Sequence, residues 1–108
     1  MPKISKEQNI VTLINTFEVD PQNQAKLIAL LVKATEETMS QFPGFISANI
    51  HRSFDGTKVV NYAQWRSQKD FELMFKDPSA QEHMKEAYTL CKRIDPNLYE
   101  VAFVDEKK

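Results

Sequence analysis

The sequence predicts one α+β domain whose elements follow the order β-α-β-β-α-β. Apolar residues alternate over 10–19 as in a strand, and a stretch with helical spacing follows. The dipeptide Asp55-Gly56 stands between two further strand-like stretches and predicts a hairpin. A second helical stretch and a final apolar stretch complete the order. This is the order of the ferredoxin-like split βαβ fold with a four-stranded antiparallel sheet.

The first half of this order has clear boundaries. Residues 10–19 are predicted to form a strand that is rich in β-branched side chains. Asp20-Pro21 then predicts a helix start, with an acceptor side chain at the cap and proline in the first turn. Helical spacing continues over 21–41, and Phe42-Pro43-Gly44 ends it.

The second half begins with the hairpin strands, which are predicted over 45–54 and 58–66. A Ser-x-x-Asp pattern at Ser67 resembles a capping box and predicts a short helix. Asp77-Pro78 starts the helix again, and its apolar spacing runs to residue 94. We expect Asp95-Pro96 to end the helix and residues 98–104 to form the last strand.

Composition limits the possible classes of function. The chain has 108 residues, 42% of them apolar and 27% charged, which fits one globular domain over 9–105 after a flexible arm of residues 1–8. A net charge of −1 without a basic run predicts no nucleic-acid partner. The longest apolar run, residues 27–32, is too short for a membrane span. A single cysteine and no secretory signal make a cytoplasmic location the simplest expectation.

The expected topology leaves one face of the sheet bare. Strands one and three are the usual central neighbours, and both helices then cover the same face. Such a bare face on a small domain suggests a second copy of the chain, so we expect a homodimer. Its interface is expected on the strand face that bears four polar side chains, Asn49, His51, Tyr62 and Gln64.

The hairpin also predicts which side chains share the covered face. A loop of two or four residues around Asp55-Gly56 places Ile50 opposite Asn61 and Ile46 opposite Trp65. Asn61 then lies in an apolar row, and Asn15 does the same in the first strand. Two buried carboxamides call for a reason, since an unpaired one costs about 1–3 kcal/mol. One explanation is that they form hydrogen bonds with each other, with the backbone at a bulge, or with a trapped water. The other is that they line a cavity and face a ligand. The pattern leaves both explanations open.

A resemblance to a known family adds to this interpretation. Residues 42–87, FPGFISANIHRSFDGTKVVNYAQWRSQKDFELMFKDPSAQEHMKEA, resemble the antibiotic biosynthesis monooxygenase domain, and the likeness extends over about residues 9–104. The family's members are ferredoxin-like dimers whose sheets form a shared α/β barrel. Each protomer has a cavity between its sheet and helices. The resemblance therefore implies the same dimer and the same cavity here.

The segment NYAQW looks like the branch that oxidises aromatic polyketides, anthrones and quinols without metal, flavin or other cofactor. That branch uses an Asn and a Trp four residues apart, which correspond to Asn61 and Trp65. Some members add a Tyr on the next helix, where this chain has Phe71, which lacks a hydroxyl. A second branch degrades haem, and it needs an Asn on strand one, which Asn15 could supply. That branch also needs a Trp and a His on the later helices, where Met74 and Met84 stand here, so haem is the minor alternative.

In the cofactor-free interpretation, molecular oxygen is the co-substrate and a small aromatic molecule is the ligand. Asn61, Trp65 and His83 are the candidate catalytic residues. Asn61 would stabilise a developing oxyanion, Trp65 would give a flat wall, and His83 would act as general base. As structural alternatives, Trp65 is a core anchor and His83 a partly exposed residue at a helix edge. The candidate substrate-binding residues are Asn15, Phe17, Phe71, Met74 and Met84.

No metal site is expected, because two His and one Cys give no known ligand spacing. Three classes of function remain open. The first is a cofactor-independent monooxygenase, the second a haem-binding or haem-degrading protein, and the third a non-catalytic dimeric module that binds a small ligand.

Overall fold

A computed structural model describes residues 10–107 of the chain, so the arm predicted at residues 1–8 lies outside the described residues. The elements follow the predicted order, with the first helical stretch ending in a short 3-10 helix (η1) and the second divided into α2 and α3. They are β1 (Val11–Val19), α1 (Pro21–Glu37), η1 (Met39–Gln41), β2 (Phe45–Arg52), β3 (Lys58–Trp65), α2 (Gln68–Phe75), α3 (Pro78–Leu90) and β4 (Cys91–Tyr99).

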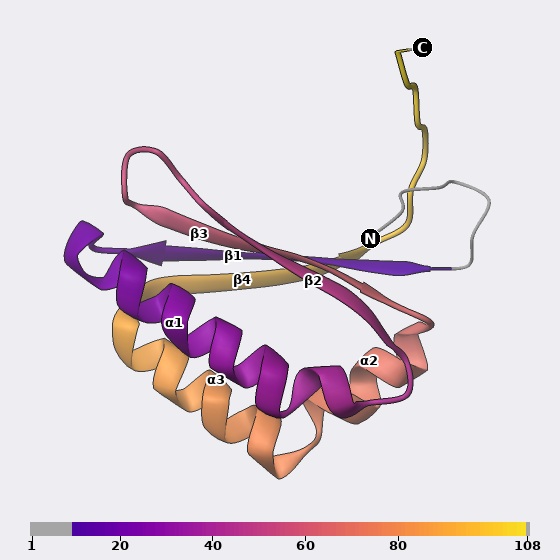
Figure 1. Ribbon diagram of the computed structural model, residues 1–108, viewed down its shortest axis with the longest axis horizontal. Helices are drawn as coiled ribbons and strands as arrows, with labels where there is room; N and C mark the ends of the chain where they lie inside the picture. The colour runs from indigo at the N-terminus through magenta and orange to yellow at the C-terminus, as the bar shows by residue number, and fades with distance from the viewer. Residues whose placement is uncertain (1–9, 108) are drawn as a thin grey trace.

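The sheet has four antiparallel strands in the order β2-β3-β1-β4, so β1 and β3 are the central neighbours, as predicted. All three α-helices lie on one face of the sheet, and no helix of residues 10–107 covers the other face (Figure 1). The ferredoxin-like α+β fold is therefore confirmed. The second copy predicted on the bare face stays a prediction.

Proline and polar residues start the helices where the sequence predicts. Pro21 is the first residue of α1, but the Asp20 side chain does not cap the helix and forms an ion pair with Lys92 at 3.1 Å. At α2 the Ser67 hydroxyl accepts a hydrogen bond from the Asp70 backbone amide at 3.1 Å, as in a capping box.

The last helix and the last strand differ from the prediction. Helix α3 ends at Leu90 rather than at residue 94, and β4 begins at Cys91 rather than at residue 98. Pro96, which we expected to follow the helix, lies inside β4 opposite Asn15. The sheet accepts a proline there because β4 is an edge strand, where a backbone nitrogen can face away from the neighbouring strand. The apolar spacing up to residue 94 was therefore a misleading helix signal.

The hairpin register confirms the predicted pair Ile50–Asn61, and Ala48 stands opposite Ala63 in the same register. One predicted pair is wrong, because the register shifts between Phe45 and Ser47, and Phe45 instead of Ile46 stands opposite Trp65. This irregularity leaves Ile46 exposed and turns the larger aromatic ring of Phe45 toward Trp65.

The bare face is not uniformly exposed. Gln64 is buried, and its carboxamide oxygen accepts a hydrogen bond from the Ser47 hydroxyl at 3.0 Å. Tyr62 is partly buried and His51 is exposed on the same face. Within residues 10–107 no helix is long and apolar enough to cross a membrane.

Candidate active site

A cavity of about 250 Å³ lies between the sheet and the three α-helices. All eight residues that the sequence singled out as candidates line it: Asn15, Phe17, Asn61, Trp65, Phe71, Met74, His83 and Met84. The fold thus brings together residues from β1, β3, α2 and α3.

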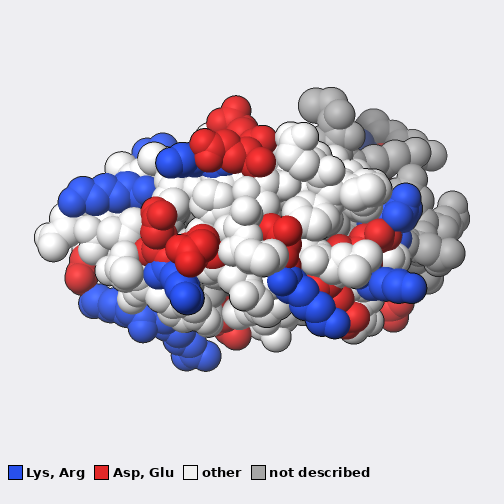
Figure 2. All heavy atoms as spheres, turned by 90° about the horizontal axis from the view of Figure 1, so that it is seen from below, with Lys and Arg blue, Asp and Glu red and all other residues white. Residues whose placement is uncertain are grey.

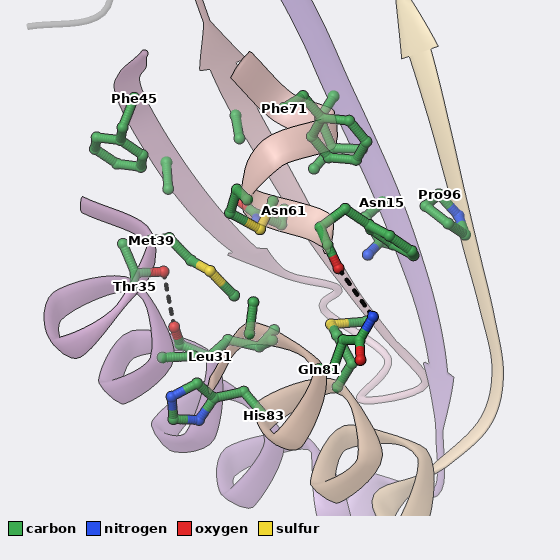
Figure 3. Close-up of a pocket in the computed structure, with 18 of the residues that line it drawn as sticks. Asn15, Leu31, Thr35, Met39, Phe45, Asn61, Phe71, Gln81, His83 and Pro96 are labelled. Atoms are coloured by element: carbon green, nitrogen blue, oxygen red, sulfur yellow. Dashed lines mark hydrogen bonds between the residues drawn. The ribbon is translucent and has the colours of Figure 1, made fainter. Parts of the chain in front are cut away.

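The two asparagines face each other across the central strand pair. Asn15 of β1 stands directly opposite Asn61 of β3, and both side chains line the cavity (Figure 3). The Oδ1 atom of each is buried and has no hydrogen-bond partner. The two carboxamides therefore do not form a hydrogen bond with each other, although the sequence left that possibility open. Rotation of an amide group lets the same position offer either N–H donors or an oxygen acceptor to a ligand.

Trp65 forms a rigid aromatic wall at the end of β3. Its side chain is only 1% exposed, and three phenylalanine rings meet it edge-on. The ring centroids of Phe45, Phe71 and Phe42 lie 5.6, 6.2 and 6.5 Å from that of Trp65. Trp65 is thus a core anchor and also a wall of the cavity, so the two interpretations of this residue are compatible.

Helix α2 is fixed at its first turn, and this positions Phe71 and Met74. Asp70 receives two hydrogen bonds from the Arg66 guanidinium, at 2.8 and 2.9 Å, and one from the Ser67 hydroxyl. The bonds from Arg66, followed by the one from Ser67, lower the pKa of Asp70. The carboxyl group rests against Gly44, where a side chain would collide with it. The cavity wall formed by α2 is therefore anchored to β2 and β3.

The other predicted lining residues are mostly apolar and differ in burial. Phe17 and Met74 are buried, whereas Phe71 and Met84 are partly buried. Phe71 supplies a ring without a hydroxyl, so a phenol-assisted step is not available at this position. These four side chains make a dry wall around the asparagine pair, which strengthens electrostatic interactions inside the cavity.

His83 lies beside α1, across the cavity from Asn15 and Asn61 (Figure 3). Its Nε2 atom is 3.1 Å from the hydroxyl oxygen of Thr38, a buried residue at the end of α1. Either group can donate in this hydrogen bond, depending on the tautomer of the imidazole. If Nε2 carries the hydrogen and donates to Thr38, Nδ1 remains as the basic atom.

Several lining residues were missed by sequence reasoning: Phe45, Phe75, Gln81, Lys85, Tyr88 and Pro96. Phe45 lines the cavity because of the shift in register, and Pro96 lines it because β4 begins at Cys91. Neither feature has a sequence signal of its own. Gln81, Lys85 and Tyr88 could have been found, because their spacing puts them on one side of a helix.

The cavity has little charge. Among the described residues that line it, Lys85 is the one with a permanent positive charge, and none has a carboxylate. Within residues 10–107 no three His, Cys, Asp or Glu side chains gather as metal ligands would. Figure 2 shows acidic and basic side chains intermingled on the helical side of the molecule, without a large patch of one sign. The cavity thus suits one flat, mainly apolar ligand with few polar groups.

Comparisons with known proteins agree with this geometry. Residues 10–86 match the model of a family described as antibiotic biosynthesis monooxygenase. A tetracenomycin-F1 monooxygenase of Streptomyces glaucescens is 48% identical over 83 residues, which cover 77% of this chain and 74% of that protein.

Solved structures show the same relationship. A monooxygenase of Streptomyces coelicolor, in complex with nanaomycin D, is 31% identical with a TM-score of 0.82, and the match covers 96% of each chain. A cofactor-independent oxygenase of Streptomyces nogalater is 22% identical with a TM-score of 0.74, over 89% of this chain and 96% of that chain. The second likeness shows a shared fold.

Proposed function

The chain belongs to the antibiotic biosynthesis monooxygenase family, and we propose that it oxidises small aromatic phenols, anthrones or quinols with molecular oxygen and without a cofactor. The observation that carries this proposal is the pair of unpartnered carboxamides, Asn15 and Asn61, in an apolar cavity. The relative 48% identical to this chain is a monooxygenase, and the solved relative 31% identical is a monooxygenase in complex with the ligand nanaomycin D.

In this reaction the electrons for oxygen come from an electron-rich substrate, and the protein supplies no redox group. An anthrone loses a proton from its methylene carbon, and the resulting carbanion gives one electron to oxygen. The substrate radical and superoxide combine to a peroxide anion, which takes the abstracted proton back and becomes a hydroperoxide. The hydroperoxide then eliminates water and leaves a carbonyl group. One oxygen molecule is thus reduced, with one of its atoms in the product and the other in water. The protein has to hold the ring, exclude water and stabilise the anion.

Asn61 and Asn15 suit the last task. Amide N–H groups stabilise negative charge on a substrate oxygen without adding a counter-charge to the cavity. The donors act in a dry site and are held by the central strands of the sheet, so little reorganisation is needed when the charge develops. Trp65 closes the inner end of the cavity as an aromatic wall, and Phe17, Phe71, Met74 and Met84 complete the apolar contact.

His83 is the proposed proton acceptor. In the tautomer with hydrogen on Nε2, the Thr38 hydroxyl accepts that hydrogen bond and Nδ1 takes the substrate's proton. The resulting imidazolium keeps its bond to Thr38. Replacement of His83 by Gln is therefore expected to slow turnover near neutral pH, where the substrate needs a base to ionise, more than at high pH, where the substrate ionises in solution.

We extend the proposal to the quaternary structure, in which the bare sheet face packs against a second copy. Sedimentation at micromolar protein concentration tests this part, and a monomer would contradict it.

Oxygen consumption by chelator-treated protein tests the activity, with anthrones and hydroquinones as substrates. Uptake above the autoxidation rate that is lost in Asn61→Ala, while the variant stays folded, is the expected result. If no substrate is consumed but aromatic ligands bind, the protein is a binding module. A haem titration with a shift of the Soret band would instead favour the haem-binding alternative.

A further inference from the structure

Five of the residues that line the cavity are exposed, and together they are called its mouth here. They are Phe75 at the end of α2, Gln81, Lys85 and Tyr88 on α3, and Pro96 on the edge strand β4. Tyr88 is 62% exposed and Phe75 is 49% exposed, whereas Trp65 and Phe17 at the inner wall are each 1% exposed. Figure 1 shows that α3 is the helix that leads directly into β4. A ligand therefore enters from this side.

The strand register gives the order of groups from the mouth inward. Pro96 stands opposite Asn15, Asn15 opposite Asn61, and Asn61 opposite Ile50. Neighbouring strands lie about 4.8 Å apart, so the path from Pro96 to Asn61 spans two such spacings, about 10 Å. An elongated aromatic molecule that reaches Asn61 still extends to the mouth.

The mouth has a polar side. Gln81, Lys85 and Tyr88 follow one another at positions i, i+4 and i+7 of α3, which places them along one side of the helix. Within residues 10–107 the Lys85 ammonium group forms no ion pair. Apart from His83, the inner wall offers the two carboxamides, the Thr35 hydroxyl and apolar side chains. The mouth thus has a permanent cation in Lys85, and the interior has no permanent charge.

We infer that Lys85, flanked by Gln81 and Tyr88, forms a subsite for a carboxylate at one end of the aromatic substrate. The inference rests on the proposed function and specifies its substrate class. A carboxylate taken into the apolar interior would lose its hydration without a permanent counter-ion, because His83 has to be neutral to accept the substrate's proton, and this loss is costly. At the mouth it stays hydrated and meets Lys85. The charged end therefore stays outside and directs the ring toward Asn15 and Asn61.

Binding of an unreactive ligand pair tests the subsite without relying on turnover. The probes are anthraquinone-2-carboxylic acid and its methyl ester, and the readout is quenching of Trp65, the chain's single tryptophan. The variants are Lys85→Gln, Lys85→Arg and Lys33→Gln, the last as a control because Lys33 is exposed on α1 and does not line the cavity.

We expect the native protein to prefer the acid by about two- to fivefold, the range of an exposed ion pair. Lys85→Gln should lose this preference, whereas Lys85→Arg and Lys33→Gln should keep it. Salt at 1 M should also abolish it, because the screening length falls to about 3 Å. Equal binding of acid and ester to native protein and Lys85→Gln would overturn the subsite and leave the aromatic site intact. Failure of both probes to bind would contradict the proposed function itself.

Discussion

The replacement of Asn61 by Leu separates stability from activity. The Oδ1 atom of Asn61 is buried without a partner, and such a group costs about 1–3 kcal/mol of folding free energy. Leucine has a similar size and no polar atom, so it removes that cost in an apolar surrounding. We expect the free energy of unfolding to rise by about 1 kcal/mol, which is about 4–8 °C in Tm for a domain of this size.

The same replacement should nearly abolish turnover. Loss of one oxyanion donor costs about 2.7–4 kcal/mol in other enzymes, or a factor of about 10²–10³ in kcat. Thermal unfolding at fixed protein concentration and oxygen uptake are measured on the same preparation, since dimerisation would make Tm depend on concentration.

Asn49→Leu is the matched control for this experiment. The carboxamide of Asn49 donates to the Tyr62 carbonyl at 3.1 Å, on the opposite face of the same hairpin. Its replacement should lower stability by about 0.5–1.5 kcal/mol and leave the cavity unchanged. A clear loss of stability in Asn61→Leu, or unchanged turnover, would refute the argument that the asparagine is kept for function.

Three other perturbations test separate parts of the molecule. Hydrogen bonds from the Thr57 side chain and backbone and from Ser53 lower the pKa of Asp55 to about 2. The contribution of the Asp55 carboxylate to stability is therefore present above about pH 4 and lost as the pH falls toward 2. The difference in Tm between native protein and Asp55→Asn should shrink over that range, and a constant difference would contradict this. Gly44→Ala should destabilise the domain by about 1–3 kcal/mol in chemical denaturation, because the new methyl group meets the Asp70 side chain, and full stability would contradict it. Tyr62→Arg on the bare face should shift sedimentation from dimer to monomer, and an unchanged dimer would place the interface elsewhere.

Much of the fold follows from local sequence signals that agree with one another. Asp55-Gly56 fixed the hairpin parity, and Gly56 does adopt the positive φ of 81° that favours glycine. That parity grouped Asn61 and Trp65 with an apolar row, and the apolar character of the row predicted that it lies on the covered face. The order of strands was predicted as the usual one of this fold, with strands one and three as central neighbours, so Asn15 could be expected near Asn61.

The structure differs from the sequence-based prediction where tertiary contacts determine the secondary structure or the strand register. Residues 91–94 have an apolar spacing that suits a helix, yet they pair with β1 because the edge of the sheet is available there. The register shift next to Phe45 is a backbone irregularity that no residue in the sequence marks. The aromatic ring of Phe45 therefore could not be assigned to the cavity from the sequence. The mouth depends on the first of these features, because the early start of β4 places Pro96 in the cavity lining. For this reason the sequence predicted the inner wall of the site and missed its entrance.

The central claim is that this cavity carries out cofactor-free oxygenation with Asn61 as oxyanion donor. Isotope labelling with ¹⁸O₂ tests it most directly, with an anthrone, chelator-treated protein and rapid quenching. We predict one labelled atom in the product carbonyl, one in water, and loss of labelled product in Asn61→Ala at unchanged fold. Labelling that persists in the variant at the native rate, or that appears only when a metal or haem is added, would contradict the claim.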